Sequence, residues 1–346
     1  MLVNLIIPDL FLPQPPGGAL DIYTQLALPH LETLLARATG EAKLGSDLES
    51  YLLAHFDVPA TSSGIAALTL LADGGQAENH YWLRADPVHL QAQRDNLVLV
   101  CGELMAITQN EANALVHALN QHYADDDMKF FCLHPERWYV STSRSPDLIT
   151  HLLPQVAGQA INDKLPSGPD GKLWRQRMNE MQMLLHTHPV NQARENAGLP
   201  LLNSVWFWGG GTLPLVQPRP ARHCWADESL ARGLAHAAGS PTHPLPRNAD
   251  AWLKDAEPRA EHLIVWDAPR CAAQYGDYAA WHACLAAFET QWAQPLMRAL
   301  RNGRIEKLTL HAVSTQSVQT FSVNRAATWR FWRRRKPLKQ YAPSVS

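Results

Sequence analysis

The chain has 346 residues, of which 46% are hydrophobic and 18% are charged. This composition excludes a disordered chain, and the length suits about two domains or one domain that carries an insertion. Lys and Arg total 30 against 32 Asp and Glu, a net charge of −2, so a globally basic nucleic-acid-binding protein is disfavoured.

Targeting and redox features are weak in this sequence. No apolar run reaches the roughly 18 residues of a transmembrane helix, and the first residues lack the basic start of a signal peptide. The five cysteines are widely spaced and form no CxxC pair, which favours buried thiols over disulfides or a zinc ribbon. We therefore expect a cytoplasmic protein without a membrane partner.

Two apolar runs end in an aspartate. Residues 2–8 are almost wholly apolar and precede Asp9, and residues 263–266 precede Asp267 in the same way. Runs that are apolar on both faces are typical of central parallel strands. Because ligands of α/β proteins bind at the carboxyl ends of such strands, the pattern predicts that Asp9 and Asp267 lie close together there.

A hydroxyl precedes one of two early helices. Helical spacing predicts helices near residues 31–38 and 48–56, and residues 11–20 between strand and helix read as a loop rich in proline and glycine. Ser46 stands just before the second helix. It is interpreted either as the helix N-cap or as a nucleophile that faces the positive end of the helix dipole.

The middle of the chain reads as a separate α+β unit. Strands are expected near residues 97–100, 130–133 and 138–141, and a helix over residues 110–123. Buried strands and helices recur towards both chain ends, which favours one parallel sheet built from both termini. The prediction is a core of residues 1–74 and 161–346, with an inserted domain at residues 75–160.

Later elements complete the predicted core. We expect helices at 172–186 and 278–300, a buried strand at 205–208 and a last strand at 307–311. Three glycines follow the buried strand, a pattern that can cradle phosphate but lacks the spacing of a nucleotide-binding loop.

Several motifs resemble the archaeal-type, cofactor-independent phosphoglycerate mutases. The longest are residues 188–198 (HPVNQARENAG) and 203–211 (NSVWFWGGG), and residues 7–9 (IPD) and 45–48 (GSDL) fit the order of the family's other motifs. Residues 82–90 (WLRADPVHL) are similar to a bacterial set of mutase-like proteins labelled RpfE-type regulatory proteins.

The resemblance implies the α/β fold of the alkaline phosphatase superfamily, a mostly parallel sheet between helices with an inserted domain. In active members two metal ions flank a Ser or Thr nucleophile, because metals lower the pKa of the hydroxyl and neutralise the phosphoryl group. Matched one residue at a time, Ser46 is the implied nucleophile, and Asp9 and Asp267 are vestigial metal ligands. An active protein would use Mn or Zn.

Four further residues fall in the best-preserved motifs: Arg84, Asn191, Arg194 and Asn203. Their functional interpretation is an anion-facing rim of the substrate pocket. Their alternative interpretation is structural, with the two asparagines capping turns and Arg194 in a salt bridge to Glu195 or Asp170.

The chain departs from the family where metal ligands are expected. No histidine follows Asp267 in residues 268–277, and no Asp-His dipeptide occurs in the chain. A site without most imidazole ligands binds metals weakly, so no cofactor is expected. The resulting hypothesis is a pseudoenzyme that binds a small phosphorylated ligand or a protein partner. The alternative is a phosphatase or phosphotransferase that acts on a small phosphomonoester through Ser46.

The tail at residues 330–339 is basic and follows Trp329. Its cations alternate with Phe331 and Trp332, a combination that suits nucleic acid. The favoured interpretation is nevertheless an aromatic helix end docked on the core, with solvated arginines around it.

Overall fold

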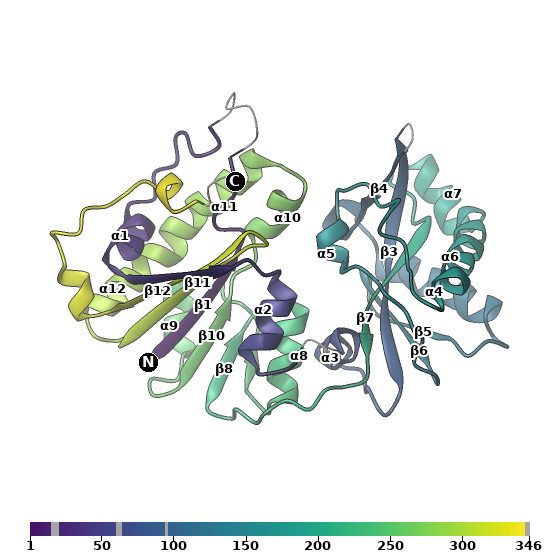
Figure 1. The fold of residues 1–346 in the computed structure, drawn as a ribbon, viewed down its shortest axis with the longest axis horizontal. Coiled ribbons are helices and arrows are strands. Elements are labelled where there is room, and N and C mark those ends of the chain that lie inside the picture. Colours follow the sequence, from purple (N-terminus) through teal and green to yellow (C-terminus); the bar gives the residue numbers. More distant parts are fainter. Residues whose placement is uncertain (15–20, 60–63, 94–95, 343–346) are drawn as a thin grey trace. The chain divides into compact units, whose positions relative to one another are not determined.

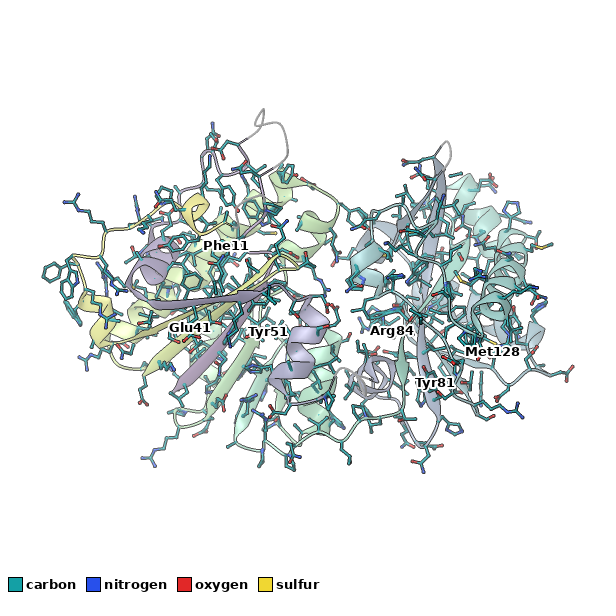
Figure 2. The ribbon with its side chains drawn as sticks, viewed as in Figure 1. Phe11, Glu41, Tyr51, Tyr81, Arg84 and Met128 are labelled. Atoms are coloured by element: carbon teal, nitrogen blue, oxygen red, sulfur yellow. The ribbon has the colours of Figure 1, made fainter. Side chains whose placement is uncertain are left out.

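The computed structural model describes residues 1–14, 21–59, 64–93 and 96–342, and it separates into two compact units (Figure 1). Unit 1 comprises Met1–Asp57 and Gln217–Ser346, and unit 2 comprises Val58–Val216. The labelled side chains of Phe11, Glu41 and Tyr51 belong to unit 1, and those of Tyr81, Arg84 and Met128 belong to unit 2 (Figure 2).

The insertion is longer at both ends than residues 75–160. Strand β7 (Ser204–Gly211) pairs with β3 (Tyr81–Gln93) across most of its length. Helix α3 (Ile65–Ala72) packs on the same two strands. Residues 58–74 and 161–216 therefore belong to unit 2, because long-range strand pairing assigns them there and local sequence does not reveal that pairing.

Unit 1 contains a seven-stranded, mostly parallel sheet in the order β2-β12-β11-β1-β10-β8-β9. Strands β11, β1, β10, β8 and β9 are parallel, whereas β12 and β2 add to one edge in antiparallel fashion. The strands are β1 (Leu2–Pro8), β2 (Thr39–Leu44), β8 (Arg222–Trp225), β9 (Thr242–His243), β10 (Glu261–Val265), β11 (Lys307–Val313) and β12 (Ser317–Asn324). This is the predicted α/β core, with β2 and β12 added to it.

Helices cover both faces of this sheet. They are α1 (Pro29–Arg37), α2 (Leu48–His55), α8 (Ser229–Ala237), α9 (Ala249–Asp255), α10 (Pro269–Gln274), α11 (Tyr278–Phe288) and α12 (Gln294–Arg301), and a π-helical turn η3 (Glu289–Ala293) joins the last two. The short 3₁₀ segments η4 (Ala326–Trp329) and η5 (Leu338–Tyr341) follow β12. The helix predicted at residues 278–300 is thus α11, η3 and α12 together. The described part of the loop expected at residues 11–20 is residues 11–14, which form no helix or strand, and the rest lies outside the described residues.

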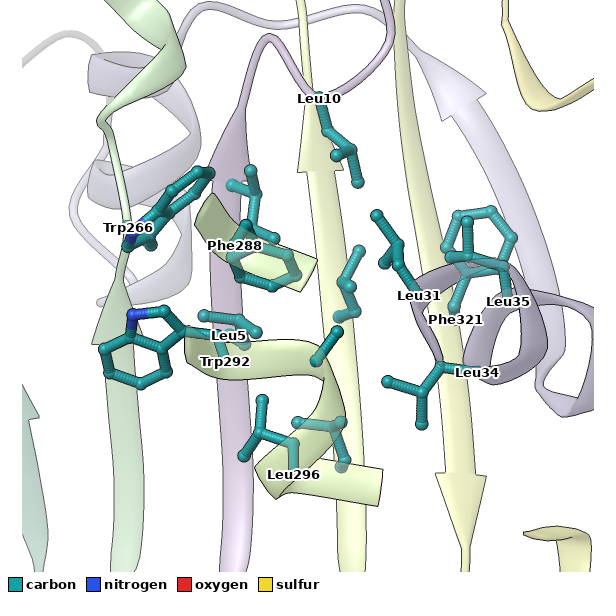
Figure 3. Packing of buried hydrophobic residues seen from close by; sticks show 14 of the residues in the cluster. Leu5, Leu10, Leu31, Leu34, Leu35, Trp266, Phe288, Trp292, Leu296 and Phe321 are labelled. Carbon is teal, nitrogen blue, oxygen red and sulfur yellow. The ribbon is translucent and has the colours of Figure 1, made fainter. Parts of the chain in front are cut away.

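The larger core lies between one sheet face and α1, α9, α11 and α12 (Figure 3). Leu5 of β1 and Phe321 of β12 point into it and meet Leu31, Phe288 and Trp292. Strand residues alternate between the two faces of a sheet. The strand residues that do not point into this core, such as Asn4 of β1, therefore point to the opposite face, under α2. Helix α1 thus buries its apolar stripe as its spacing predicted.

Unit 2 is an antiparallel sheet with helices. Its strands are β3, β4 (Asn96–Val100), β5 (Lys129–His134), β6 (Arg137–Thr142) and β7. Its helical segments are α3, η2 (Gly102–Met105), α4 (Gln109–His122), α5 (Leu153–Val156), α6 (Gly171–His186) and α7 (Pro189–Asn196). The strands and the long helices expected in this part of the chain are present within a few residues of their predicted bounds.

The three glycines 209–211 lie inside β7 rather than in a phosphate-binding turn. A Cβ on Gly210 would lie 2.3 Å from the Tyr81 hydroxyl oxygen, and one on Gly211 would lie 2.8 Å from the Cα of Gly64. The glycines therefore allow neighbouring chain to approach the strand closely. Trp206 and Trp208 are buried core residues, as predicted.

Across the described ranges, every helix is too short or too polar to cross a membrane.

Candidate functional site

Acidic side chains gather at the carboxyl edge of the parallel sheet in unit 1. Strands β1 and β10 are adjacent and parallel, with Ile6 opposite Val265. Asp9 follows β1 directly and Asp267 follows β10 by two residues, so the prediction that both stand at the carboxyl ends of adjacent parallel strands is confirmed. Glu228 follows β8, the next strand in the sheet.

Asp9 is held in an unusual backbone conformation. Its φ is 53°, in the left-handed region that aspartate tolerates better than most residues. Its N–H donates to the Val313 carbonyl at 2.9 Å, and its carbonyl accepts from the Trp281 indole at 2.9 Å. Burial raises the pKa of Asp9 to about 6, against the opposing effect of the nearby Arg270 charge.

The cation of this cluster is Arg270, on α10. Its Nη2 donates to both carboxylate oxygens of Glu49, at 2.7 and 2.9 Å. Glu49 lies in the first turn of α2, and its side chain is only 3% exposed. Burial opposes the charge on Arg270, but the carboxylates of Glu49, Glu228 and Asp9 raise its pKa above the ordinary value. Arg270 thus remains a guanidinium among carboxylates.

Glu228 is the N-cap of α8. Its carboxylate accepts from the backbone N–H groups of Leu230 at 2.9 Å and Ala231 at 2.6 Å. Burial, together with the negative charges of Glu49 and Asp267, raises the pKa of Glu228 to about 7, although the backbone hydrogen bonds from Leu230 and Ala231 lower it. The carboxylates of this cluster therefore repel one another electrostatically along the sheet edge.

The cluster contains four carboxylates, Asp9, Glu49, Glu228 and Asp267, and one guanidinium. Two of the carboxylates are already committed, Glu49 to Arg270 and Glu228 to the start of α8. Within the described residues, no three His, Cys, Asp or Glu side chains converge as a metal-binding group would require. This donor set does not fit a pair of catalytic metal ions, which need imidazole and carboxylate ligands aimed at a common point.

Ser46 lies at the same edge of the sheet, between β2 and α2. Its N–H donates to the Ser314 carbonyl at 2.9 Å, just past the end of β11, and its hydroxyl donates to the Asp47 carbonyl at 3.1 Å. The N-cap of α2 is Asp47, which accepts from the Ser50 N–H at 2.7 Å. The N-cap interpretation of Ser46 was therefore wrong by one residue.

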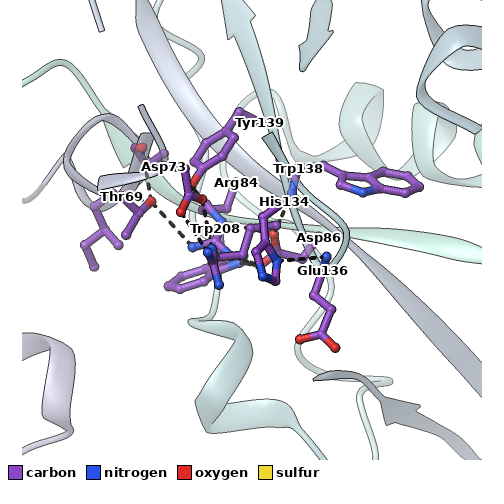
Figure 4. A network of polar contacts seen from close by, with 12 residues as sticks. Thr69, Asp73, Arg84, Asp86, His134, Glu136, Trp138, Tyr139 and Trp208 are labelled. Atoms are coloured by element: carbon purple, nitrogen blue, oxygen red, sulfur yellow. Dashed lines mark hydrogen bonds and ion pairs between the residues drawn. The ribbon is translucent and has the colours of Figure 1, made fainter. Parts of the chain in front are cut away.

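Arg84 is buried in unit 2 instead of facing an anion at a pocket rim. Its Nε and Nη2 donate to the two carboxylate oxygens of Asp86 at 3.0 and 2.8 Å (Figure 4). The guanidinium also lies between the rings of Tyr139 and Trp208, 5.3 and 4.9 Å from their centroids. Its charge is satisfied inside the protein, with Thr69 as a further partner at 3.4 Å.

The other predicted rim residues are also structural. Asn191 bridges the carbonyls of Leu185 and Leu202, at 2.8 and 3.0 Å, and Asn203 pairs with both backbone groups of Leu90. Arg194 is 1% exposed and pairs with Glu111 at 2.9 Å. The alternative interpretation of Arg194 was right about a salt bridge but wrong about the partner, which is Glu111 instead of Glu195 or Asp170. The motif HPVNQARENAG thus holds α7 against its surroundings.

Sequence reasoning missed Glu49, Glu228 and Arg270. Glu49 and Glu228 each look like an ordinary acidic residue at a helix start, and Arg270 lies in a short segment between Asp267 and α11. For Glu49 and Arg270 the one available signal was position, because each follows a predicted site residue, Ser46 or Asp267, by three residues. Glu228 offered no such signal, because the strand before it, β8, was not predicted.

Comparisons with known proteins agree with this fold. Residues 36–191 match the family model of 2,3-bisphosphoglycerate-independent phosphoglycerate mutase. Proteins of that name from Methanosarcina mazei and, as a probable one, from Geobacter sulfurreducens are each 26% identical to the chain over 54% of its length and 49% of theirs. The matched part of the chain thus spans about half the length of these curated relatives.

Solved structures share the architecture at low sequence identity. A cofactor-independent phosphoglycerate mutase from Thermoplasma acidophilum aligns with a TM-score of 0.52 and 14% identity, over 100% of this chain and 95% of that one. A protein from Pyrococcus horikoshii aligns with a TM-score of 0.58 and 11% identity, over 93% of this chain and 87% of that one. By sequence the chain is similar to 2,3-bisphosphoglycerate-independent phosphoglycerate mutases, and it shares the alkaline phosphatase-like fold of the cofactor-independent mutases.

Proposed function

We propose that this phosphoglycerate mutase-like protein binds a partner in a regulatory role and does not catalyse phosphoryl transfer. The observation that carries the proposal is the Glu49–Arg270 ion pair inside the carboxylate cluster. A fixed guanidinium there neutralises carboxylates that would otherwise be free to hold metal ions.

Electrostatics support the same proposal. Four carboxylates against one guanidinium give the cluster a net negative charge when all are ionised. A phosphomonoester is itself an anion, and like charges at close range in a poorly solvated site repel strongly. The edge of the sheet therefore disfavours a small phosphorylated ligand, and a protein partner is the preferred candidate.

The cellular setting is part of the proposal. Cys132, Cys224 and Cys284 have free thiols. Free thiols suit a reducing compartment, so we place the protein in the cytoplasm. The similarity of residues 82–90 to a bacterial set of mutase-like proteins supports a bacterial source.

A metal titration combined with a turnover assay tests the proposal. We expect no turnover of a generic phosphomonoester by the wild-type protein with added Mn or Zn, and weak binding of Mn by calorimetry. Arg270→Ala removes the guanidinium and frees Glu49, so it should bind Mn more tightly than wild type. Arg298→Ala is the matched control, because it breaks an exposed ion pair with Asp250 elsewhere in unit 1.

The alternative is a phosphatase or phosphotransferase that uses Ser46 as nucleophile. The position of Ser46 at the same sheet edge as the carboxylates favours it. Metal-dependent turnover by the wild-type protein that disappears in Ser46→Ala would establish this alternative and overturn the non-catalytic proposal.

A further inference from the structure

Residues 329–336 form an exposed segment that carries aromatic and cationic side chains, here called the basic-aromatic strip. Trp329, Phe331 and Trp332 are 62%, 77% and 69% exposed. The expectation that these rings dock on the core as a helix end was therefore wrong. The backbone of residues 330–337 is irregular, between η4 and η5.

The strip is fastened to unit 1 at several points. Thr328 and Leu338 on either side are each 1% exposed. The Leu338 N–H donates to Glu32 at 3.0 Å, and the Arg333 Nη1 donates to the Ala38 carbonyl at 2.7 Å. The rings are therefore presented from a fixed stretch of chain, the last yellow part of Figure 1.

Positive charge accumulates along the strip with little compensation. It contains five cations and no acidic residue: Arg330, Arg333, Arg334, Arg335 and Lys336. Within the described residues, the only carboxylate in an ion pair with any of them is that of Glu32, 3.4 Å from Arg335. Arg37 lies nearby and donates to the Thr328 carbonyl, and burial together with the Arg301 charge lowers its pKa.

We propose that the basic-aromatic strip binds single-stranded nucleic acid. Exposed ring faces stack on unpaired bases whatever the sequence, and guanidinium groups bind the phosphates between them with paired donors. The rings of Phe331 and Trp332 meet nearly edge to face, 5.4 Å apart and at 79°. This contact leaves most of each ring face open, in keeping with their high exposure.

The arrangement favours nucleic acid over a membrane surface. A membrane-bound amphipathic helix separates its cations and its apolar residues onto opposite faces. Here the backbone is not helical, and Arg330 stands between two aromatic residues in sequence. The exposed apolar groups of the strip are all flat aromatic rings, which suits stacking on bases. The inference does not depend on the proposed role of the carboxylate cluster.

Fluorescence anisotropy with labelled oligothymidylate tests the inference on the full chain. We expect binding with a log–log salt slope of about −3, since about four uncompensated cations each contribute about −0.7 on single strands. Phe331→Ala and Trp332→Ala should each weaken binding about tenfold. Arg334→Glu with Lys336→Glu should weaken binding and flatten the salt slope.

A charge-matched control is Lys254→Glu with Arg259→Glu, two exposed cations of unit 1 outside the strip. It should leave binding unchanged, and all variants should keep the wild-type melting temperature because the altered side chains are exposed. The inference is overturned if the oligonucleotide does not bind or if the ring substitutions have no effect, which would indicate simple polyanion binding. It is also overturned if duplex DNA or phosphatidylglycerol vesicles bind more tightly at equal phosphate concentration.

Discussion

At the scale of single residues, the N-cap of α2 shows how hydrogen bonds decide between two neighbours that could both fill the position. Asp47 and Ser46 both carry a side chain that can cap a helix, but the Asp47 carboxylate accepts from Ser50, whereas the Ser46 hydroxyl turns to the Asp47 carbonyl. A Cβ on Gly45 would lie 2.0 Å from the Thr315 carbonyl oxygen, so close packing fixes the path of the chain just before them. That path places Asp47 at the cap.

The first prediction concerns this pair. Asp47→Ala should lower the free energy of unfolding by about 1 kcal/mol, the usual cost of losing an N-cap, whereas Ser46→Ala should cost no more than about 0.5 kcal/mol. Urea unfolding of both variants beside wild type provides the measurement. A larger loss in Ser46→Ala than in Asp47→Ala would refute the assignment of the cap.

A second prediction concerns the buried pair in unit 2. Arg84→Met leaves the Asp86 carboxylate buried beside only neutral donors, Trp138 N–H and Trp208 indole. Removing one member of a buried ion pair costs about 3–5 kcal/mol, and unfolding by urea should show that loss. Arg144→Met removes an exposed arginine of the same unit and should be nearly neutral. Equal effects of the two substitutions would contradict the importance of the pair.

At the scale of elements, α2 covers a polar patch on the second face of the unit 1 sheet. The Tyr51 hydroxyl lies 2.8 Å from Nδ1 of His311, and the Nε2 of His311 lies 3.2 Å from Asn4. Burial lowers the pKa of His311 to about 3. Burial, with the charges of Arg222 and Arg219, lowers the pKa of His55 to about 4. Both imidazoles are therefore neutral in the folded protein near neutral pH.

The third prediction follows from the sign of these shifts. When a folded-state pKa lies below the unfolded value of 6.5, only the unfolded state takes up a proton, so stability is lost as the pH falls from about 6.5 towards 4. His55→Leu removes that titration. Relative to wild type, its unfolding free energy should improve by about 2–3 kcal/mol between about pH 7 and pH 4.5.

Urea unfolding at a series of pH values provides this measurement. The comparison with wild type is needed because the raised pKa of Glu228 acts in the opposite direction. His236→Leu, at an exposed position on α8, is the control and should run parallel to wild type. If the difference in unfolding free energy between His55→Leu and wild type does not change with pH, the lowered pKa of His55 in the folded protein is contradicted.

At the scale of the whole molecule, the chain forms two units that each have their own sheet and buried core. Compact units that each have their own core are expected to unfold separately. The fourth prediction is therefore two unfolding transitions in calorimetry. Arg84→Met should lower only the unit 2 transition, and Asp47→Ala only the unit 1 transition. A single transition shifted equally by both substitutions would show that the units unfold together.

The sequence by itself determined the elements whose signal is local. The apolar runs before Asp9 and Asp267 predicted adjacent parallel strands, because a strand that is buried on both faces carries apolar residues at nearly every position. Helical spacing located α1, α2, α4 and α6, because each helix buries apolar residues that recur every three or four positions. The motifs around residues 188–211 were enough to indicate the fold family, although their conserved-looking polar residues proved to hold α7 and β7 in place.

Only the tertiary structure decided which residues share a site and which strands share a sheet. Glu49, Glu228 and Arg270 come together from three separate segments, and nothing local distinguishes them from solvated charges until the parallel strands align their ends. The pairing of β7 with β3 moved the boundary of the insertion, because strand pairing acts across more than a hundred residues of sequence. The exposure of Trp329, Phe331 and Trp332 likewise depends on what the rest of unit 1 leaves uncovered. Which charged side chains converge and which aromatic side chains stay exposed depends on how distant segments pack together, so the local sequence pattern does not reveal either.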